Sequence, residues 1–313
     1  MVPILFHTLR EFRPRQWIKN LSLYAALVFS GFFFQSGYFI HVTIAFVIFC
    51  LLSSAIYIVN DIVDAPADRQ HPFKKKRPIA SGALPMSFAQ GIAGGLFALV
   101  LTLAIMTGSV FFVVIVVAYA ALHIWYTFTL KHIAILDVMT IATGFILRVY
   151  AGAVIVNLHM SVWFLLTVIS ASLFLAVAKR QSERTLMKGT GKELRETRET
   201  LEHYSQRLLD VYAGMFATAT WLTYALYTFQ RDEFSPEGRL VKYFALLPKT
   251  FTSQKWLMVT VPLVIYGVMR YLQLAYEQNE GESPERVILR DKALLITGIA
   301  WGSLVMMLLY GLG

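Results

Sequence analysis

Apolar stretches of about 20 residues alternate with short polar segments along most of this sequence. A helix needs about 20 consecutive apolar residues to cross the hydrocarbon core of a bilayer. The pattern therefore predicts an all-α polytopic membrane protein with nine transmembrane helices. The expected spans are Trp17 to Phe34, Phe39 to Asn60, Met86 to Thr107, Val110 to Thr129, Ile133 to Val154, Val162 to Ala178, Leu208 to Phe229, Trp256 to Tyr276 and Ala293 to Leu312.

Composition supports a membrane protein and argues against a soluble domain. Of the 313 residues, 57% are hydrophobic and only 15% are charged, which is more apolar surface than a soluble fold can bury. The net charge of +9 would suit a nucleic-acid partner, but the basic residues fall in short segments between apolar spans, as in cytoplasmic loops. We therefore expect no nucleic acid as a partner.

The distribution of Lys and Arg predicts the orientation. Basic residues concentrate before the first span, after the second and after the sixth, and such segments stay on the cytoplasmic side. We expect an integral protein of the inner (cytoplasmic) membrane, with the N-terminus inside and the active site facing the cytoplasm.

An acid-rich segment follows the second span. If the end of that span is helical, Asn60 and Asp64 are i,i+4 neighbours and Asp61 and Asp64 are i,i+3 neighbours, and Asp68 follows. Mg²⁺ takes oxygen ligands and commonly bridges one or two carboxylates to substrate phosphates. We interpret this segment as a site for a magnesium-bound diphosphate. The alternative is a solvated cytoplasmic loop, which explains the basic residues Lys74 to Arg77 but not the acids.

Cations that suit phosphate lie near the predicted cytoplasmic ends of other spans: Lys19, Lys131, Lys179 and Arg180. Any one of them alone is better explained as an anchor at the lipid headgroups, but together with the acidic segment on the same face they favour a phosphate site. Arg148 lies deeper in an apolar span, where an arginine is costly. We interpret it as a cavity-facing anion ligand, with a structural ion pair as the alternative. Tyr57, one turn before Asp61, is a further candidate for the same ligand.

The segment NDIVDAPADRQHP followed by KKKRPIASG resembles the first acidic signature, NDxxDxxxD, of the UbiA-type intramembrane prenyltransferase superfamily. The resemblance implies a single domain over residues 1–313. It also implies a nine-helix bundle around a central cavity open to the cytoplasm.

One departure from the superfamily pattern is informative. Typical members carry a second acidic DxxxD motif at the end of helix six, whereas this sequence reads Ala178-Lys179-Arg180-Gln181-Ser182-Glu183. Cations in place of carboxylates suit two phosphorylated substrates. The sequence is similar to the decaprenyl-phosphate phosphoribosyltransferase branch through RPRQWIKN at 13–20, LKH at 130–132, ILRVYAG around Arg148 and GESPE at 281–285.

That branch implies Mg²⁺-dependent transfer of a 5-phosphoribosyl group from phosphoribosyl diphosphate (PRPP) to a polyprenyl phosphate. It implies metal ligands at Asn60, Asp64 and Asp68, with Asp61, Asp64 and Asp68 in catalysis. The substrate-binding residues that it implies are Lys19, Tyr57, Lys74, Arg77, Lys131, Arg148, Lys179 and Arg180.

Two alternatives stay open from the sequence. One is a UbiA-type prenyltransferase that joins a prenyl diphosphate to an aromatic or lipid acceptor, against which the missing second motif argues. The other is a transporter, which should show paired broken helices in corresponding halves. The sequence leaves open the chain length of the lipid and whether residues 181–207 form a lid or a connector. It also leaves open whether the protein forms a homo-oligomer.

Overall fold

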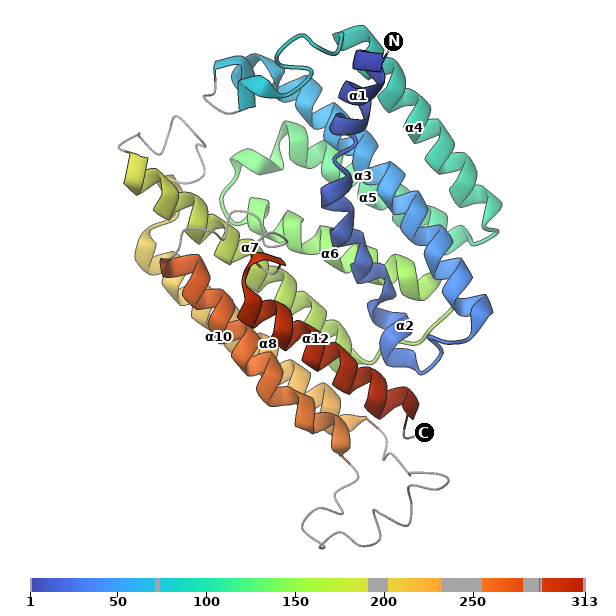
Figure 1. The fold of residues 1–313 in the computed structure, drawn as a ribbon, viewed down its shortest axis with the longest axis vertical. Coiled ribbons are helices and arrows are strands. Elements are labelled where there is room, and N and C mark those ends of the chain that lie inside the picture. Colours follow the sequence, from blue (N-terminus) through green and yellow to red (C-terminus); the bar gives the residue numbers. More distant parts are fainter. Residues whose placement is uncertain are drawn as a thin grey trace, which may run out of the picture. The chain divides into compact units, whose positions relative to one another are not determined.

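The computed structural model describes residues 2–70, 74–190, 202–231, 255–277, 287 and 289–311. All regular elements in these ranges are helical (Figure 1), which confirms the predicted all-α class. The chain forms two compact units, Met1–His159 and Met160–Gly313, and each is described by itself. The single domain expected from the sequence stays a prediction.

The first unit contains the acidic segment. Its long helix α3 packs against α4 and α5, and α5 packs against α6. The elements are α1 (Val2–Glu11), the 3-10 helix η1 (Pro14–Leu23), α2 (Tyr24–Ser30), α3 (Ser36–Gln70), η2 (Lys74–Lys76), α4 (Met86–Met106), α5 (Val110–Phe128), η3 (Leu130–His132) and α6 (Leu136–Val154).

The second unit is a helical bundle in which α7 packs along α8, and α10 packs against α7, α8 and α12. Its elements are α7 (Val162–Thr190), α8 (Gln206–Gln230), η8 (Trp256–Thr260), α10 (Val261–Glu277), α12 (Lys292–Met306) and the π-helical turn η9 (Met307–Gly311).

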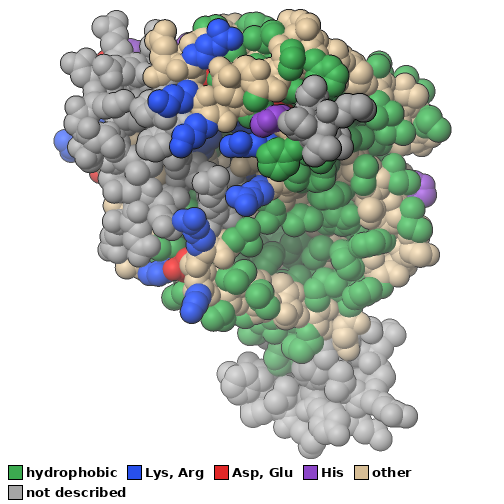
Figure 2. Space-filling view, turned by 45° about the horizontal axis from the view of Figure 1, so that its top comes forward, with side chains coloured by type: hydrophobic (Ala, Val, Ile, Leu, Met, Phe, Trp, Pro, Cys, Tyr) green, Lys and Arg blue, Asp and Glu red, His purple; other side chains and the backbone are tan. Residues whose placement is uncertain are grey.

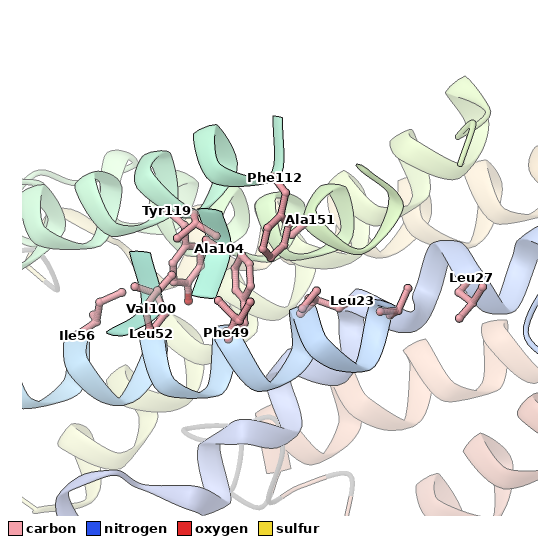
Figure 3. Close-up of a cluster of buried hydrophobic side chains, with 14 residues drawn as sticks. Leu23, Leu27, Phe49, Leu52, Ile56, Val100, Ala104, Phe112, Tyr119 and Ala151 are labelled. Carbon is pink, nitrogen blue, oxygen red and sulfur yellow. The ribbon is translucent and has the colours of Figure 1, made fainter. Parts of the chain in front are cut away.

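An aromatic cluster joins helices α3 and α5 of the first unit. The ring of Phe49 on α3 lies 5.1 Å from that of Tyr119 and 6.2 Å from that of Phe112, both on α5. Figure 3 shows these rings packed with aliphatic side chains from neighbouring helices. Edge-on and tilted ring pairs of this kind add to the stabilisation from buried apolar area, so they fix α5 against α3.

The outer surface is that of a membrane protein. Large apolar side chains such as Phe111, Met106 and Val110 are about three-quarters exposed, and Figure 2 shows hydrophobic side chains over much of the described part of the face in view. Within the described residues, seven helices are long and apolar enough to span a membrane. These findings establish a polytopic membrane protein. The described residues contain seven such helices, so the predicted number of nine spans is not confirmed.

The predicted first span, Trp17 to Phe34, is not one continuous α-helix. It consists of η1 and the short α2, which ends at Ser30 and is followed by Gly31 with φ 90°. Side chains three residues apart eclipse one another in a 3-10 helix, so Trp17, Asn20 and Leu23 share a face. Trp17 Nε1 donates to Ser54 Oγ at 3.1 Å, Asn20 approaches Ser53 at 3.4 Å, and Leu23 is fully buried. Contacts with α3 therefore decided this conformation.

Two helices extend beyond their predicted ends. Helix α3 continues from the apolar span through the whole acidic segment to Gln70, and α7 continues past Ala178 to Thr190. Gln181 to Thr190 is thus helix and not loop. Of residues 181–207, which we expected to form a lid or a connector, residues 191–201 lie outside the described residues.

Helix α6 approaches η1 very closely at Gly152. A Cβ atom at this position would stand 1.9 Å from the backbone oxygen of Leu23. The absence of a side chain therefore allows the two backbones to touch.

We expect Gly152→Ala to destabilise the protein by about 1–3 kcal/mol, because the methyl group would force the two helices apart. Gly94→Ala on α4 is the matched control: no atom lies within 4 Å of its added Cβ, and alanine stabilises a helix interior by about 0.5–1 kcal/mol. Thermal unfolding in detergent measures both, and equal midpoints for the two variants would contradict the close approach.

Candidate functional site

The acidic segment lies on α3, which distributes its side chains over two neighbouring faces. Asp61 and Asp68 are seven residues apart, close to two full turns, and both are buried. Asn60 and Asp64 are i,i+4 neighbours, and Asn60 Nδ2 donates to Asp64 Oδ2 at 3.1 Å. The helical spacing expected for Asn60 and Asp64 is thus confirmed, and the segment forms two pairs of oxygen-bearing side chains.

Two arginines surround the buried pair. Arg13 Nη2 lies 2.7 Å and 2.5 Å from the two oxygens of Asp61. Arg77 Nη1 lies 2.9 Å from Asp61 Oδ1 and 2.6 Å from Asp68 Oδ2. Two carboxylates and two guanidiniums therefore form one compact network, in which Asp61 is only 1% exposed.

Each arginine in this network uses only one nitrogen to bind the carboxylates. Neither the Nε nor the remaining terminal nitrogen of Arg13 or Arg77 hydrogen-bonds to a described residue, and each side chain is about a quarter exposed. A guanidinium offers donors in a planar fork that matches phosphate. Both arginines are therefore oriented by Asp61 and keep donors for an external anion.

A third carboxyl group, Glu11 at the end of α1, joins the network. It is 2% exposed, hydrogen-bonds to Asp61, and accepts from the backbone N–H of Ile79 through Oε1 at 3.2 Å. Burial raises the pKa of Glu11 to about 7, and the hydrogen bond and negative charge of Asp61 act in the same direction. Burial is the largest single effect and would lower the pKa of Arg13, but the charge and hydrogen bond of Asp61, with smaller effects of Glu11 and Tyr57, together raise that pKa.

The second face of α3 meets the short helix η3. Lys131 Nζ lies 2.7 Å from Asp64 Oδ1, and Thr127 Oγ1 lies 3.4 Å from Asn60 Oδ1. The Asp64 side chain is 28% exposed, in contrast to the other two aspartates. Asp64 is therefore the carboxylate most accessible to a ligand.

The oxygen atoms on this second face suit Mg²⁺, a hard ion that takes oxygen ligands. Asn60 contributes an amide oxygen and Asp64 a partly exposed carboxylate. Among the described residues no three His, Cys, Asp or Glu side chains form a metal cage. Mg²⁺ is usually held by one or two carboxylates plus substrate phosphates, so this donor set fits an ion that arrives with a phosphorylated ligand.

Arg148 lies deeper, on α6, and is 5% exposed. Its Nε donates to Asn20 Oδ1 at 2.8 Å and its Nη1 to the Gly144 oxygen at 3.1 Å, and its guanidinium lies 4.9 Å from the Tyr119 ring. It forms no ion pair with a carboxylate of the described residues, so the alternative of a structural ion pair is not observed there. Its role as an anion ligand stays a prediction.

Three further predicted residues of the first unit lie around these groups. The guanidinium of Arg13 stands 5.2 Å from the centre of the Tyr57 ring. Lys74 acts electrostatically on Asp68 together with Arg77. Lys19, in η1 next to Asn20, acts on His123, a histidine whose buried Nε2 has no hydrogen-bond partner among the described residues.

Lys179 and Arg180 belong to the second unit. They lie inside α7, where Arg180 is fully buried and forms an ion pair with Glu183 one turn later. Their part in the same site stays a prediction.

Sequence reasoning missed Glu11 and Arg13 as members of the site. Both precede the first apolar stretch, where Arg13 served only as part of a motif and as a topology signal. One signal was available: Glu11 is the only acid among the first 60 residues. A lone carboxyl group beside several arginines is a candidate for a buried pairing.

Comparison with known proteins identifies the family. Residues 22–293 match the model of the UbiA prenyltransferase family. The chain is 35% identical to the decaprenyl-phosphate phosphoribosyltransferase of Corynebacterium glutamicum over 96% of its own length and 86% of that protein. It is also 35% identical to the protein of that name from Mycolicibacterium smegmatis, over 94% of this chain and 89% of the relative.

Solved structures show the same fold. A UbiA homolog from Archaeoglobus fulgidus bound to DMAPP and Mg²⁺ aligns with a TM-score of 0.69 at 16% identity, covering 96% of this chain and 98% of the other. A structure described for digeranylgeranylglyceryl phosphate synthase aligns with a TM-score of 0.64 at 16% identity, over 96% and 99% of the two chains. The helical architecture, the membrane spans and the sequence match together place this chain in the UbiA prenyltransferase family.

Proposed function

We propose that this membrane protein transfers a 5-phosphoribosyl group from PRPP to a polyprenyl phosphate of the decaprenyl type and releases diphosphate. The names of its relatives, at about 35% identity over nearly the whole chain, support this assignment. The proposal includes Mg²⁺ as cofactor and an active site on the cytoplasmic side.

One observation carries the proposal. Every aspartate of the acidic segment is paired with a cation: Asp61 with Arg13 and Arg77, Asp68 with Arg77, and Asp64 with Lys131. At the position where a second acidic motif would lie, α7 carries Lys179 and Arg180 instead. Cations paired with every aspartate of the segment, and a sequence without a second acidic motif, suit substrates that both bear phosphate.

The reaction requires little acid–base chemistry from the protein. An oxygen of the lipid phosphate, already ionised at neutral pH, forms a bond to C1 of the ribose. The bond from C1 to the diphosphate oxygen breaks, and its electron pair leaves with the diphosphate. When bound, Mg²⁺ neutralises charge on that leaving group, and Asn60 and Asp64 are the residues that would hold it.

The protein's cations stabilise the same developing charge. Arg13 and Arg77 are held in place by Asp61 before any ligand binds, so their free donors need no reorientation when the diphosphate departs. Donors that are oriented in advance commonly supply the greatest share of an enzyme's rate enhancement. We assign Arg148 and Lys19 to the remaining phosphate oxygens, and the apolar helix surfaces to the polyprenyl chain.

The direct test offers purified protein and Mg²⁺ two labelled donors: PRPP with polyprenyl phosphates, and a prenyl diphosphate with aromatic acceptors. We expect label in the lipid extract only from PRPP. Transfer from the prenyl diphosphate alone would overturn the proposal in favour of an ordinary prenyltransferase.

Asp64→Ala should abolish turnover, because it removes the accessible carboxylate on which metal binding depends. Loss of one oriented electrostatic partner costs at least about a hundredfold in rate. The initial rate over a range of Mg²⁺ concentrations measures the effect. The exposed Asp210→Asn on α8 serves as the control and should behave as the wild type. Near-normal turnover of the Asp64 variant would refute its assignment to the metal.

Lys131→Ala should raise the KM for PRPP at least about tenfold, since the bond that we assign between its ammonium group and a donor phosphate joins charged groups and is worth about 1.5–3 kcal/mol. Lys131→Arg should keep most of the affinity because it retains the positive charge opposite Asp64. Steady-state kinetics with the lipid phosphate saturating measures both variants. An unchanged KM in the alanine variant would exclude Lys131 from donor binding.

A further inference from the structure

Glu11 connects two parts of the first unit that are distant in the sequence. Its carboxyl group hydrogen-bonds to Asp61 on α3 and accepts from the backbone N–H of Ile79, in the turns between η2 and α4. The Glu11 side chain is almost fully buried, so Glu11 is not itself a ligand of the diphosphate.

The hydrogen bond between Glu11 and Asp61 requires a proton on one of the two carboxyl groups. Asp61 faces two guanidiniums, whereas Glu11 faces Asp61 from α3, a backbone amide, and only Arg13 as a cation. Because burial and Asp61 raise the pKa of Glu11 to about 7, Glu11 is the group that holds the proton below about pH 7. It donates to Asp61 and accepts from Ile79, as a carboxamide could.

The link to Ile79 also determines where Arg77 lies. The backbone around Arg77 is held by short-range hydrogen bonds, from Arg77 N to the Lys74 oxygen and from Ser81 N to the Arg77 oxygen, both at 2.9 Å. Fixing Ile79 against Glu11 therefore fixes Arg77, two residues earlier, opposite Asp61 and Asp68. Arg77 reaches both carboxylates with one nitrogen, a geometry that a small shift of this turn would break.

We propose that Glu11 is a positioning residue of the diphosphate site: its buried carboxyl group, bonded to the backbone of Ile79, holds the Arg77 turn against Asp61, so that the free donors of Arg13 and Arg77 stay aligned for a diphosphate. This inference rests on the proposed function only for PRPP as the donor. Binding of a diphosphate anion does not depend on it. Ionisation of Glu11 would add a negative charge to the network and weaken anion binding.

The test compares Glu11→Gln with Glu11→Ala. Glutamine can donate and accept as the protonated acid does, so we expect a KM for PRPP within about twofold of the wild type. Alanine removes both bonds, and we expect a KM raised about tenfold with kcat reduced much less, because Glu11 does not touch the reacting atoms. The exposed Glu202→Ala is the control for loss of a carboxyl group. Equal KM values for the two Glu11 variants would overturn the proposal.

Binding of inorganic diphosphate with Mg²⁺, measured by calorimetry without turnover, separates this inference from the proposed function. If PRPP proves not to be the donor, weaker diphosphate binding in Glu11→Ala than in Glu11→Gln still supports the positioning role. Equal binding in both, with only a lower melting temperature for alanine, would show a purely structural role and overturn it.

A pH series covers the case in which Glu11→Ala does not fold. The ratio of diphosphate affinities between wild type and Glu11→Gln cancels the titration of diphosphate itself. We expect that ratio to fall several-fold between about pH 6 and pH 8, as Glu11 ionises in the wild type alone. A constant ratio would overturn the proposal.

Discussion

The candidate site depends on one ionic arrangement, the pairing of the buried Asp61 carboxylate with Arg13 and Arg77. A buried carboxylate is costly unless cations and hydrogen bonds compensate it, and here both are present. The arrangement joins the N-terminal segment, the end of α3 and the turn before α4. It also leaves each guanidinium with unused donors, so the same interaction that shapes the local fold leaves groups that suit an anion.

Burial divides the aspartates of the acidic segment into two kinds of position. Asp61 and Asp68 are enclosed by arginines, whereas Asp64 is partly exposed beside Asn60 and Lys131. A metal ion that accompanies a phosphorylated substrate needs an accessible carboxylate, and a preorganised anion site needs buried ones to orient its cations. The i,i+4 and i,i+7 spacings on a single helix supply both.

The membrane makes the deeper polar groups informative. Arg148 is surrounded by Asn20, a backbone carbonyl and aromatic rings, without a carboxylate among the described residues to neutralise it. A charge in an apolar bundle is expensive, and such residues are retained where a polar ligand or water reaches them. The buried nitrogen of His123 nearby, also without a partner there, marks the same region of α5 and α6 as more polar than its surroundings.

The sequence by itself determined the helical class, the membrane location, most span boundaries and the acidic segment, because these depend on local periodicity and on residue types. The sequence also determined the helical spacing of Asn60, Asp61, Asp64 and Asp68. Only the tertiary structure decided that the first predicted span is a 3-10 helix followed by a short α-helix, that α3 continues to Gln70, and that Glu11 and Arg13 join the site. Those outcomes depend on contacts between segments about 30 to 70 residues apart, such as Trp17 with Ser54, Arg13 with Asp61 and Glu11 with Ile79, whose energies no local pattern contains.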